Sequence, residues 1–130
     1  MFDTVHRAGK HVFFHSDGYV LDIIPDLIEI GVDALNIQIY LMGIEKISEE
    51  LDGKVYILAD VDRQNFLPFG IPEKICQSIK HLIHAFSDFN SRLIAWGEIG
   101  PDVPLSNAEA MPKTFWKCGQ YPIKNETKDK

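Results

Sequence analysis

The segment from His11 to Ile39 has the pattern of a strand, a helix and the next strand, and this unit constrains the fold more than any other feature. Residues 11–15 form a short apolar run rich in aromatic and β-branched side chains, which is typical of a buried strand. A polar turn with Gly18 follows, and Leu21–Ile30 then has a helical period of apolar residues. Residues 33–39 begin the next buried strand. The sequence therefore predicts one β-α-β unit with parallel strands.

The rest of the chain repeats this pattern. We predict further strands at residues 55–61 and 92–96, a loop at 62–70, and helices at 2–8, 44–51, from Pro72 and from Ser106. Ser106-Asn107-Ala108-Glu109 has the capping-box pattern. Two prolines lie inside helical segments. We expect a break at Ile23–Ile24, so that Pro25 begins the helix proper, and we expect Pro112 to kink or cut the last helix.

Strands that alternate with helices indicate an α/β fold with parallel pairing and right-handed crossovers. No glycine-rich dinucleotide or Walker pattern follows a strand, which argues against a nucleotide-binding doubly wound sheet. A TIM-type (β/α)8 barrel needs eight such units and roughly 250 residues, whereas this chain has 130 residues and four units. We therefore predict a parallel (β/α)4 half-barrel over residues 1–123 and a disordered tail at 124–130, which contains no apolar residue.

Composition and charge exclude several classes of protein. The chain is 45% hydrophobic and 25% charged, which suits one soluble domain, and its net charge of −6 disfavours binding to nucleic acid. No apolar run approaches the ~20 residues that cross a bilayer, and the N-terminus lacks the order of a signal peptide. Cys76 and Cys118 form no disulfide framework. We expect a cytoplasmic protein with no membrane or nucleic-acid partner.

Polar side chains end all four predicted strands. They are His15, Ser16, Asp17, Asn36, Gln38, Asp60, Asp62, Arg63 and Glu98. Every strand ends in something polar, but the carboxyl ends of parallel strands meet at one edge, where α/β proteins form their sites. Arg63 suits a carboxylate through two parallel hydrogen bonds, and His15 suits a proton donor or a metal ligand. Asp17 could orient His15 or accept a hydrogen bond from a pyrrole-type N–H group.

An open half-barrel leaves its first and last strands unpaired and one face of its sheet uncovered. We expect Phe13, Leu35, Ile57 and Ile94, or their immediate neighbours, to lie on this uncovered face. The chain should then self-associate through its edges or be poorly soluble.

Three motifs resemble the C-terminal half of the uroporphyrinogen decarboxylase family, which includes the corrinoid-linked methyltransferases. They are His15-Ser16-Asp17-Gly18 with Ile24-Pro25-Asp26-Leu27 to Asn36, Asp62-Arg63-Gln64 with Leu67 to Glu73, and Ile99 to Pro104 with Ala110-Met111. They occur in the family's order and span about residues 3–112. The resemblance implies a (β/α)8 barrel with a substrate cleft at its carboxyl face. It also implies decarboxylation of a porphyrinogen or similar polycarboxylate in porphyrin biosynthesis.

The resemblance also implies roles for individual residues. His15 and Asp17 become candidate catalytic residues, and Asn36, Asp62, Arg63 and Glu98 become candidate substrate-binding residues. The chain departs from the family at several points. The family's arginine-rich motif and catalytic aspartate lie in the first half of the barrel, whereas this chain resembles the second half. Gly97 stands where decarboxylases carry a histidine. The zinc-binding methyltransferases have cysteines where Asp17 and Gly97 stand here, so we expect no metal cofactor, with zinc through His15 as the alternative.

Three functions remain open from the sequence. The first is a decarboxylase-family protein that binds a small carboxylate or tetrapyrrole substrate and is incomplete alone. The second is corrinoid-linked methyl transfer. The third is a non-catalytic, split half-barrel that needs a partner, either a second copy of the chain or a separate half-barrel.

Overall fold

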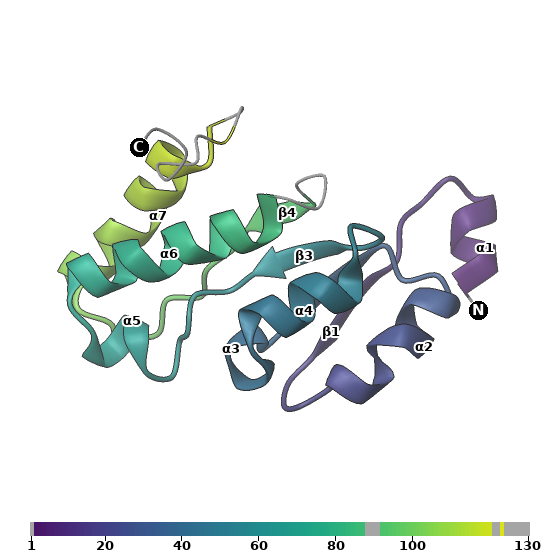
Figure 1. Ribbon diagram of the computed structural model, residues 1–130, viewed down its shortest axis with the longest axis horizontal. Helices are drawn as coiled ribbons and strands as arrows, with labels where there is room; N and C mark the ends of the chain where they lie inside the picture. Colours follow the sequence, from purple (N-terminus) through teal and green to yellow (C-terminus); the bar gives the residue numbers. More distant parts are fainter. Residues whose placement is uncertain (1, 88–91, 121–122, 124–130) are drawn as a thin grey trace.

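The computed structural model describes residues 2–87, 92–120 and 123, which form an α/β fold built on one sheet (Figure 1). Its four parallel strands are β1 (Phe13–Ser16), β2 (Ala34–Ile37), β3 (Tyr56–Ala59) and β4 (Leu93–Ala95). The strands lie side by side in chain order, β1-β2-β3-β4. A doubly wound sheet would reverse its order at a switch point, whereas successive strands of a barrel follow this order.

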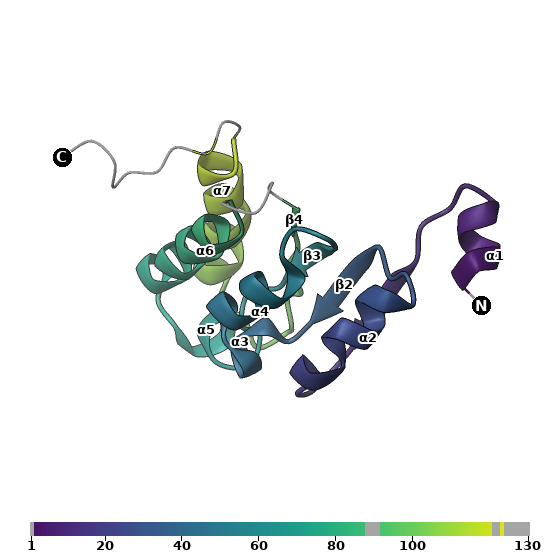
Figure 2. The ribbon, with the colours of Figure 1, turned by 45° about the vertical axis from the view of Figure 1, so that its right-hand side comes forward.

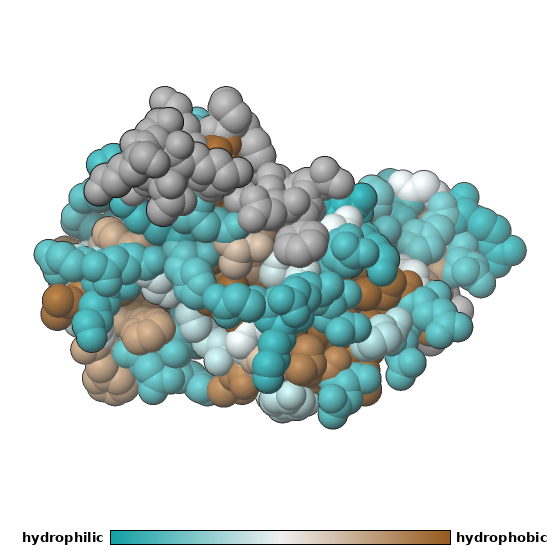
Figure 3. Space-filling model, in the orientation of Figure 1, coloured by the Kyte–Doolittle hydropathy of each residue, from teal (hydrophilic) through white to brown (hydrophobic). Residues whose placement is uncertain are grey.

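Helices connect the strands. They are α1 (Phe2–Arg7), α2 (Ile24–Glu29), α3 (Ile39–Met42), α4 (Ile44–Leu51), α5 (Phe66–Phe69), α6 (Pro72–Ser87) and α7 (Leu105–Cys118), with a 3₁₀ turn, η1 (Leu21–Ile23), before α2. Of the helices in the described part of the chain, none is long and apolar enough to cross a membrane. The outer side of α2, α4 and α6, which Figure 3 views, is mostly hydrophilic with a few apolar patches.

One face of the sheet packs against the helices. Phe14, Leu35, Ile57 and Leu93 are neighbours across the four strands, and both Leu35 and Ile57 are completely buried. This row joins residues of α2, α4 and α6 in the main hydrophobic core. Right-handed crossovers between strands in chain order place the helices on the same side, as Figure 2 shows. A second apolar cluster joins α5, α6 and α7.

The opposite face of the sheet has no covering layer in the described residues. The side chains of Phe13, Tyr56 and Ile94 are 55%, 45% and 40% exposed, although Leu58 between them is buried. The prediction for this face was therefore right for Phe13 and Ile94. On the inner strands the alternative given with it holds, because Tyr56, the immediate neighbour of Ile57, lies on this face. Leu35 and Ile57 themselves point to the helix-covered side, since successive strand residues point to opposite faces.

The structure confirms the predicted order of strands and main helices. Each strand is shorter than expected, and α2 begins beside Pro25 after a separate 3₁₀ turn, as predicted. The short helices α3 and α5 were missed, and α5 occupies part of the expected loop at 62–70. The expected disordered tail at 124–130 lies outside the described residues.

The predicted cap of the last helix was wrong, and of the two effects expected of Pro112 the cut does not occur. α7 begins at Leu105 after Pro104 without a side-chain cap, and Pro112 does not cut it. Proline inside a helix costs about 3 kcal/mol, so tertiary contacts must hold α7 together. Met111 is buried in the second apolar cluster, and the buried amide of Asn107 donates hydrogen bonds to the carbonyl oxygens of Leu67 (2.9 Å) and Gly70 (2.8 Å). These contacts anchor the turns of α7 before Pro112 against α5 and the second apolar cluster.

The one-sided burial of the sheet predicts that two apolar strand residues, one on each face, contribute differently to the free energy of unfolding. Leu35→Ala should lower the free energy of unfolding by about 2–5 kcal/mol, because it leaves a cavity under the helices. Phe13→Ala, the matched control on the open face, should cost less than about 1 kcal/mol. Urea unfolding of dilute protein measures both values, and equal costs would mean that the face carrying Phe13 is covered.

Candidate functional site

The parallel register brings the polar ends of all four strands to one edge of the sheet. His15, Asp17 and Asn36 come from β1 and β2, Arg63 follows β3, and Glu98 follows β4. The edge holds four carboxyl groups, those of Asp17, Asp60, Asp62 and Glu98, around one guanidinium group. The candidate site is therefore rich in hydrogen-bond acceptors and has one strong cationic donor.

Arg63 connects the first and the last strand. Its Nη2 donates to Oδ1 of Asp17 at 2.9 Å, and its Nη1 donates to Oε2 of Glu98. The Arg63 side chain is 30% exposed, whereas the carboxylates of Asp17 and Glu98 are each 61% exposed. Exposed ion pairs contribute little to stability, so these two contacts are open to exchange with a competing carboxylate.

His15 is held by its neighbour on β2. Its Nδ1 lies 2.6 Å from Oδ1 of Asn36. Because an amide oxygen only accepts hydrogen bonds, Nδ1 carries the hydrogen in this contact. The other ring nitrogen, Nε2, does not take part in it. Nε2 lies 3.8 Å from Oδ2 of Asp17, which also binds Arg63 through Oδ1. Of the predicted site residues, His15, Asp17, Asn36, Arg63 and Glu98 thus form one connected group.

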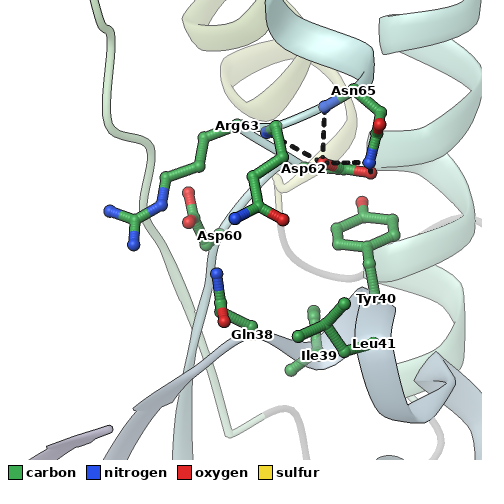
Figure 4. A pocket seen from close by; sticks show the side chains of 9 residues that line it. Gln38, Ile39, Tyr40, Leu41, Asp60, Asp62, Arg63 and Asn65 are labelled. Carbon is green, nitrogen blue, oxygen red and sulfur yellow. Dashed lines mark hydrogen bonds between the residues drawn. The ribbon is translucent and has the colours of Figure 1, made fainter. Parts of the chain in front are cut away.

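Asp62 serves the loop after β3. Its Oδ1 accepts hydrogen bonds from the backbone N–H groups of Gln64 (2.9 Å) and Asn65 (2.8 Å), and its Oδ2 accepts one from the Asn65 side chain at 3.1 Å (Figure 4). An Asp side chain that binds the backbone two and three residues ahead fixes a turn. Asp62, predicted to bind substrate, lies in the wall of the site, but its oxygens are already occupied.

A pocket of about 90 Å³ opens beside this loop. Its wall contains Gln38, Tyr40, Asp60, Asp62, Arg63 and Asn65 among other residues (Figure 4). The Tyr40 hydroxyl is 2.7 Å from Oγ of Ser78, and burial raises the pKa of Tyr40, so the phenol stays protonated. Oε1 of Gln38 accepts the backbone N–H of Gly18 at 2.7 Å. Gln38 thus ties the glycine turn after β1 to this pocket.

The sequence places Asp60 among the polar strand ends, but no catalytic or binding role was predicted for it. It directly follows β3, and its Oδ1 is buried with no hydrogen-bond partner in the described part of the chain. Burial raises the pKa of Asp60 to about 6, although the Arg63 charge and the Glu98 backbone oppose that shift. Ala59 and Val61 are both fully buried. The signal in the sequence was the place of the Asp60 carboxyl group between two apolar residues, Ala59 and Val61, at the end of the predicted strand.

The residues do not fit a zinc site with thiolate ligands. In the described residues, no three His, Cys, Asp or Glu side chains gather as a metal site. Asp17 and Gly97 occupy the positions that the methyltransferase resemblance gives to cysteine. A Cβ atom at Gly97 would lie 2.3 Å from Sδ of Met111, so any side chain there would displace this core methionine.

The buried carboxyl of Asp60 predicts a pH-dependent contribution to stability. Its pKa is about 6 in the folded chain against an ordinary value of 3.8, so the folded state binds this proton more tightly than the unfolded state. The contribution of Asp60 is therefore present below pH 4 and declines as the pH rises through 6.

Asp60→Asn removes this dependence because an amide has no proton to lose. We expect the unfolding free energy of the wild type, relative to Asp60→Asn, to fall between pH 4 and pH 7. Asp102→Asn, in an exposed loop, is the control. A difference between wild type and Asp60→Asn that stays constant over this range would contradict the raised pKa.

Comparisons with known proteins give no information on function, so a function is inferred from the residues of the site. No protein-family model matches the chain, and a search of the curated proteins finds no match. The resemblance to the uroporphyrinogen decarboxylase family therefore stays a prediction from sequence motifs.

Proposed function

We propose that this chain forms one half of a (β/α)8-type barrel that decarboxylates a porphyrinogen or a similar small polycarboxylate once a second half-barrel closes the cleft. One observation carries the proposal. Arg63 lies at the carboxyl edge of the parallel sheet and already binds two carboxylates, from residues that follow β1 and β4. A guanidinium with two such partners has the geometry for substrate carboxylates.

The residues around Arg63 suit the steps of a decarboxylation. Arg63 would exchange Asp17 or Glu98 for a substrate carboxylate and so orient the substrate. When the bond to the leaving carboxyl group breaks, carbon dioxide departs and its electron pair stays on the substrate. The substrate carbon then takes up a proton, and Asp17 or His15 would stabilise this charge or move the proton. His15 presents Nε2 for this purpose because Asn36 holds Nδ1.

The open side of the sheet favours a second half-barrel as partner. Phe13, Tyr56 and Ile94 are exposed, and β1 and β4 each have an unpaired edge in the described sheet. Closing a sheet into a barrel removes such edges. Beside the end of β4 lies an apolar groove of about 340 Å³, lined by Trp96 after β4 and by Met111, Phe115 and Trp116 of α7. A strand and a helix of the second half-barrel, placed beside β4, would cover this groove.

Binding of uroporphyrin, a stable probe for the porphyrinogen, tests the proposal. Arg63→Ala should weaken binding about tenfold or more, because hydrogen bonds between charged groups contribute about 1.5–3 kcal/mol each. Fluorescence titration of the purified chain measures the affinity, and Arg63→Lys should retain part of it because lysine keeps the charge but not the two parallel donors.

Lys113→Ala is the control, since Lys113 is an exposed cation on α7 that pairs with Glu109. Thermal unfolding verifies that all variants fold. Equal affinities of Arg63→Ala and Lys113→Ala would refute the role of Arg63. If the wild type does not bind uroporphyrin, the proposed substrate class is wrong.

A further inference from the structure

The proposed substrate and the charge of the site conflict. A polycarboxylate would approach an edge with four carboxyl groups and one guanidinium, and Arg63 is already paired with Asp17 and Glu98. Like charges at close range in a partly buried site are unfavourable. The site can accept a polyanion more readily if one of its own carboxyl groups is neutral.

Asp60 differs from the other three carboxyl groups in its environment. Asp17 and Glu98 are exposed and paired with Arg63, and Asp62 accepts the hydrogen bonds of its own loop. Oδ1 of Asp60 is buried and has no partner in the described residues, and Asp60 is one of the residues that line the 90 Å³ pocket beside Arg63. A buried acceptor without a donor is costly, whereas a protonated carboxyl can donate to a ligand.

We propose that Asp60 binds the substrate in its protonated form and donates a hydrogen bond from its carboxyl group to a substrate carboxylate beside Arg63. The inference rests on the proposed function, because it assigns Asp60 to recognition of the same polycarboxylate. Ligand and proton then bind together. Asp60 thereby determines that the cleft takes anions despite its excess of carboxyl groups.

The groups that face Asp60 are consistent with a neutral carboxyl. Burial raises the pKa of Asp60 to about 6, and the charges of Glu98, which follows β4, and of Asp62 act in the same direction. Arg63 and a backbone hydrogen bond from Glu98 act against them. Tyr40, on α3, stays neutral and is bonded to Ser78. Replacing Glu98 by a substrate carboxylate would keep one negative charge beside Asp60 and so preserve the drive toward protonation.

Coupled binding of a proton predicts a definite pH dependence. Above pH 6, Asp60 must take up a proton for each ligand bound, so the affinity should fall by up to about tenfold for each pH unit. Between pH 6 and pH 8 the carboxylates of the ligand are already ionised. His15 is the histidine of the same cleft, so His15→Gln tests whether the pH dependence belongs to Asp60.

The experiment measures uroporphyrin affinity at pH 6, 7 and 8 and constant ionic strength for the wild type, Asp60→Asn and His15→Gln. We expect the wild type to lose about tenfold in affinity between pH 7 and pH 8, and His15→Gln to keep this slope. Asp60→Asn, a permanently neutral donor of the same shape, should bind with the same affinity at every pH. A slope in Asp60→Asn equal to that of the wild type would overturn the inference.

A second readout does not depend on the ligand or on the folding of a variant. Carbon-13 NMR of the wild-type carboxyl groups should show Asp60 titrating near pH 6, above the exposed aspartates. Titration of Asp60 together with the exposed aspartates would overturn the inference even if uroporphyrin binds. Conversely, if uroporphyrin fails to bind at any pH while Asp60 titrates near 6, the proposed function fails and the neutral Asp60 stands.

Discussion

The burial of only one face of the sheet is the constraint on which the rest of the structure depends. The row Phe14, Leu35, Ile57 and Leu93 packs under the helices, and this contact fixes which side chains point the other way. Because strand residues alternate, the same register leaves Phe13, Tyr56 and Ile94 exposed. The parallel order then brings the polar strand ends together at one edge, so core, open face and candidate site follow from one packing arrangement.

The chemistry of the edge depends on how its charges are shared. Arg63 pairs with both Asp17 and Glu98, and Asp62 is committed to the turn that leads into α5. Asp60 remains as the one carboxyl of the four with a buried oxygen that no described residue satisfies. Under the proposed function, such a site would bind carboxylates through exchange at Arg63 and would adjust its charge through Asp60.

The sequence predicted the features that depend on local periodicity. The order of strands, the parallel sheet and the start of α2 beside Pro25 all come from short-range patterns that the structure bears out. It failed where tertiary contacts override local preference. Pro112 stays inside α7 because Asn107 and Met111 anchor that helix, and no local signal shows those contacts. The residues of the uncovered face were predicted only to within one position, because a one-residue shift in a strand exchanges its two faces.

The candidate site was predicted less completely than the fold. The edge itself followed from parallel pairing, and His15, Asp17, Asn36, Arg63 and Glu98 do form one connected group there. The place of Asp60 between the apolar residues Ala59 and Val61 indicated burial, but it did not separate the role of Asp60 from that of Asp62. Which of them is buried and which one caps a turn depends on the loop path and on α5, and α5 was not expected.

The central claim is that a second half-barrel must cover the open face and edges of this sheet, and the solution mass of the purified chain tests it most directly. Light scattering coupled to size exclusion should give twice the chain mass of 14.8 kDa, or larger assemblies, because exposed edges and Phe13, Tyr56 and Ile94 favour association. A uniform species of 14.8 kDa with slow amide exchange in β1 and β4 would contradict the account.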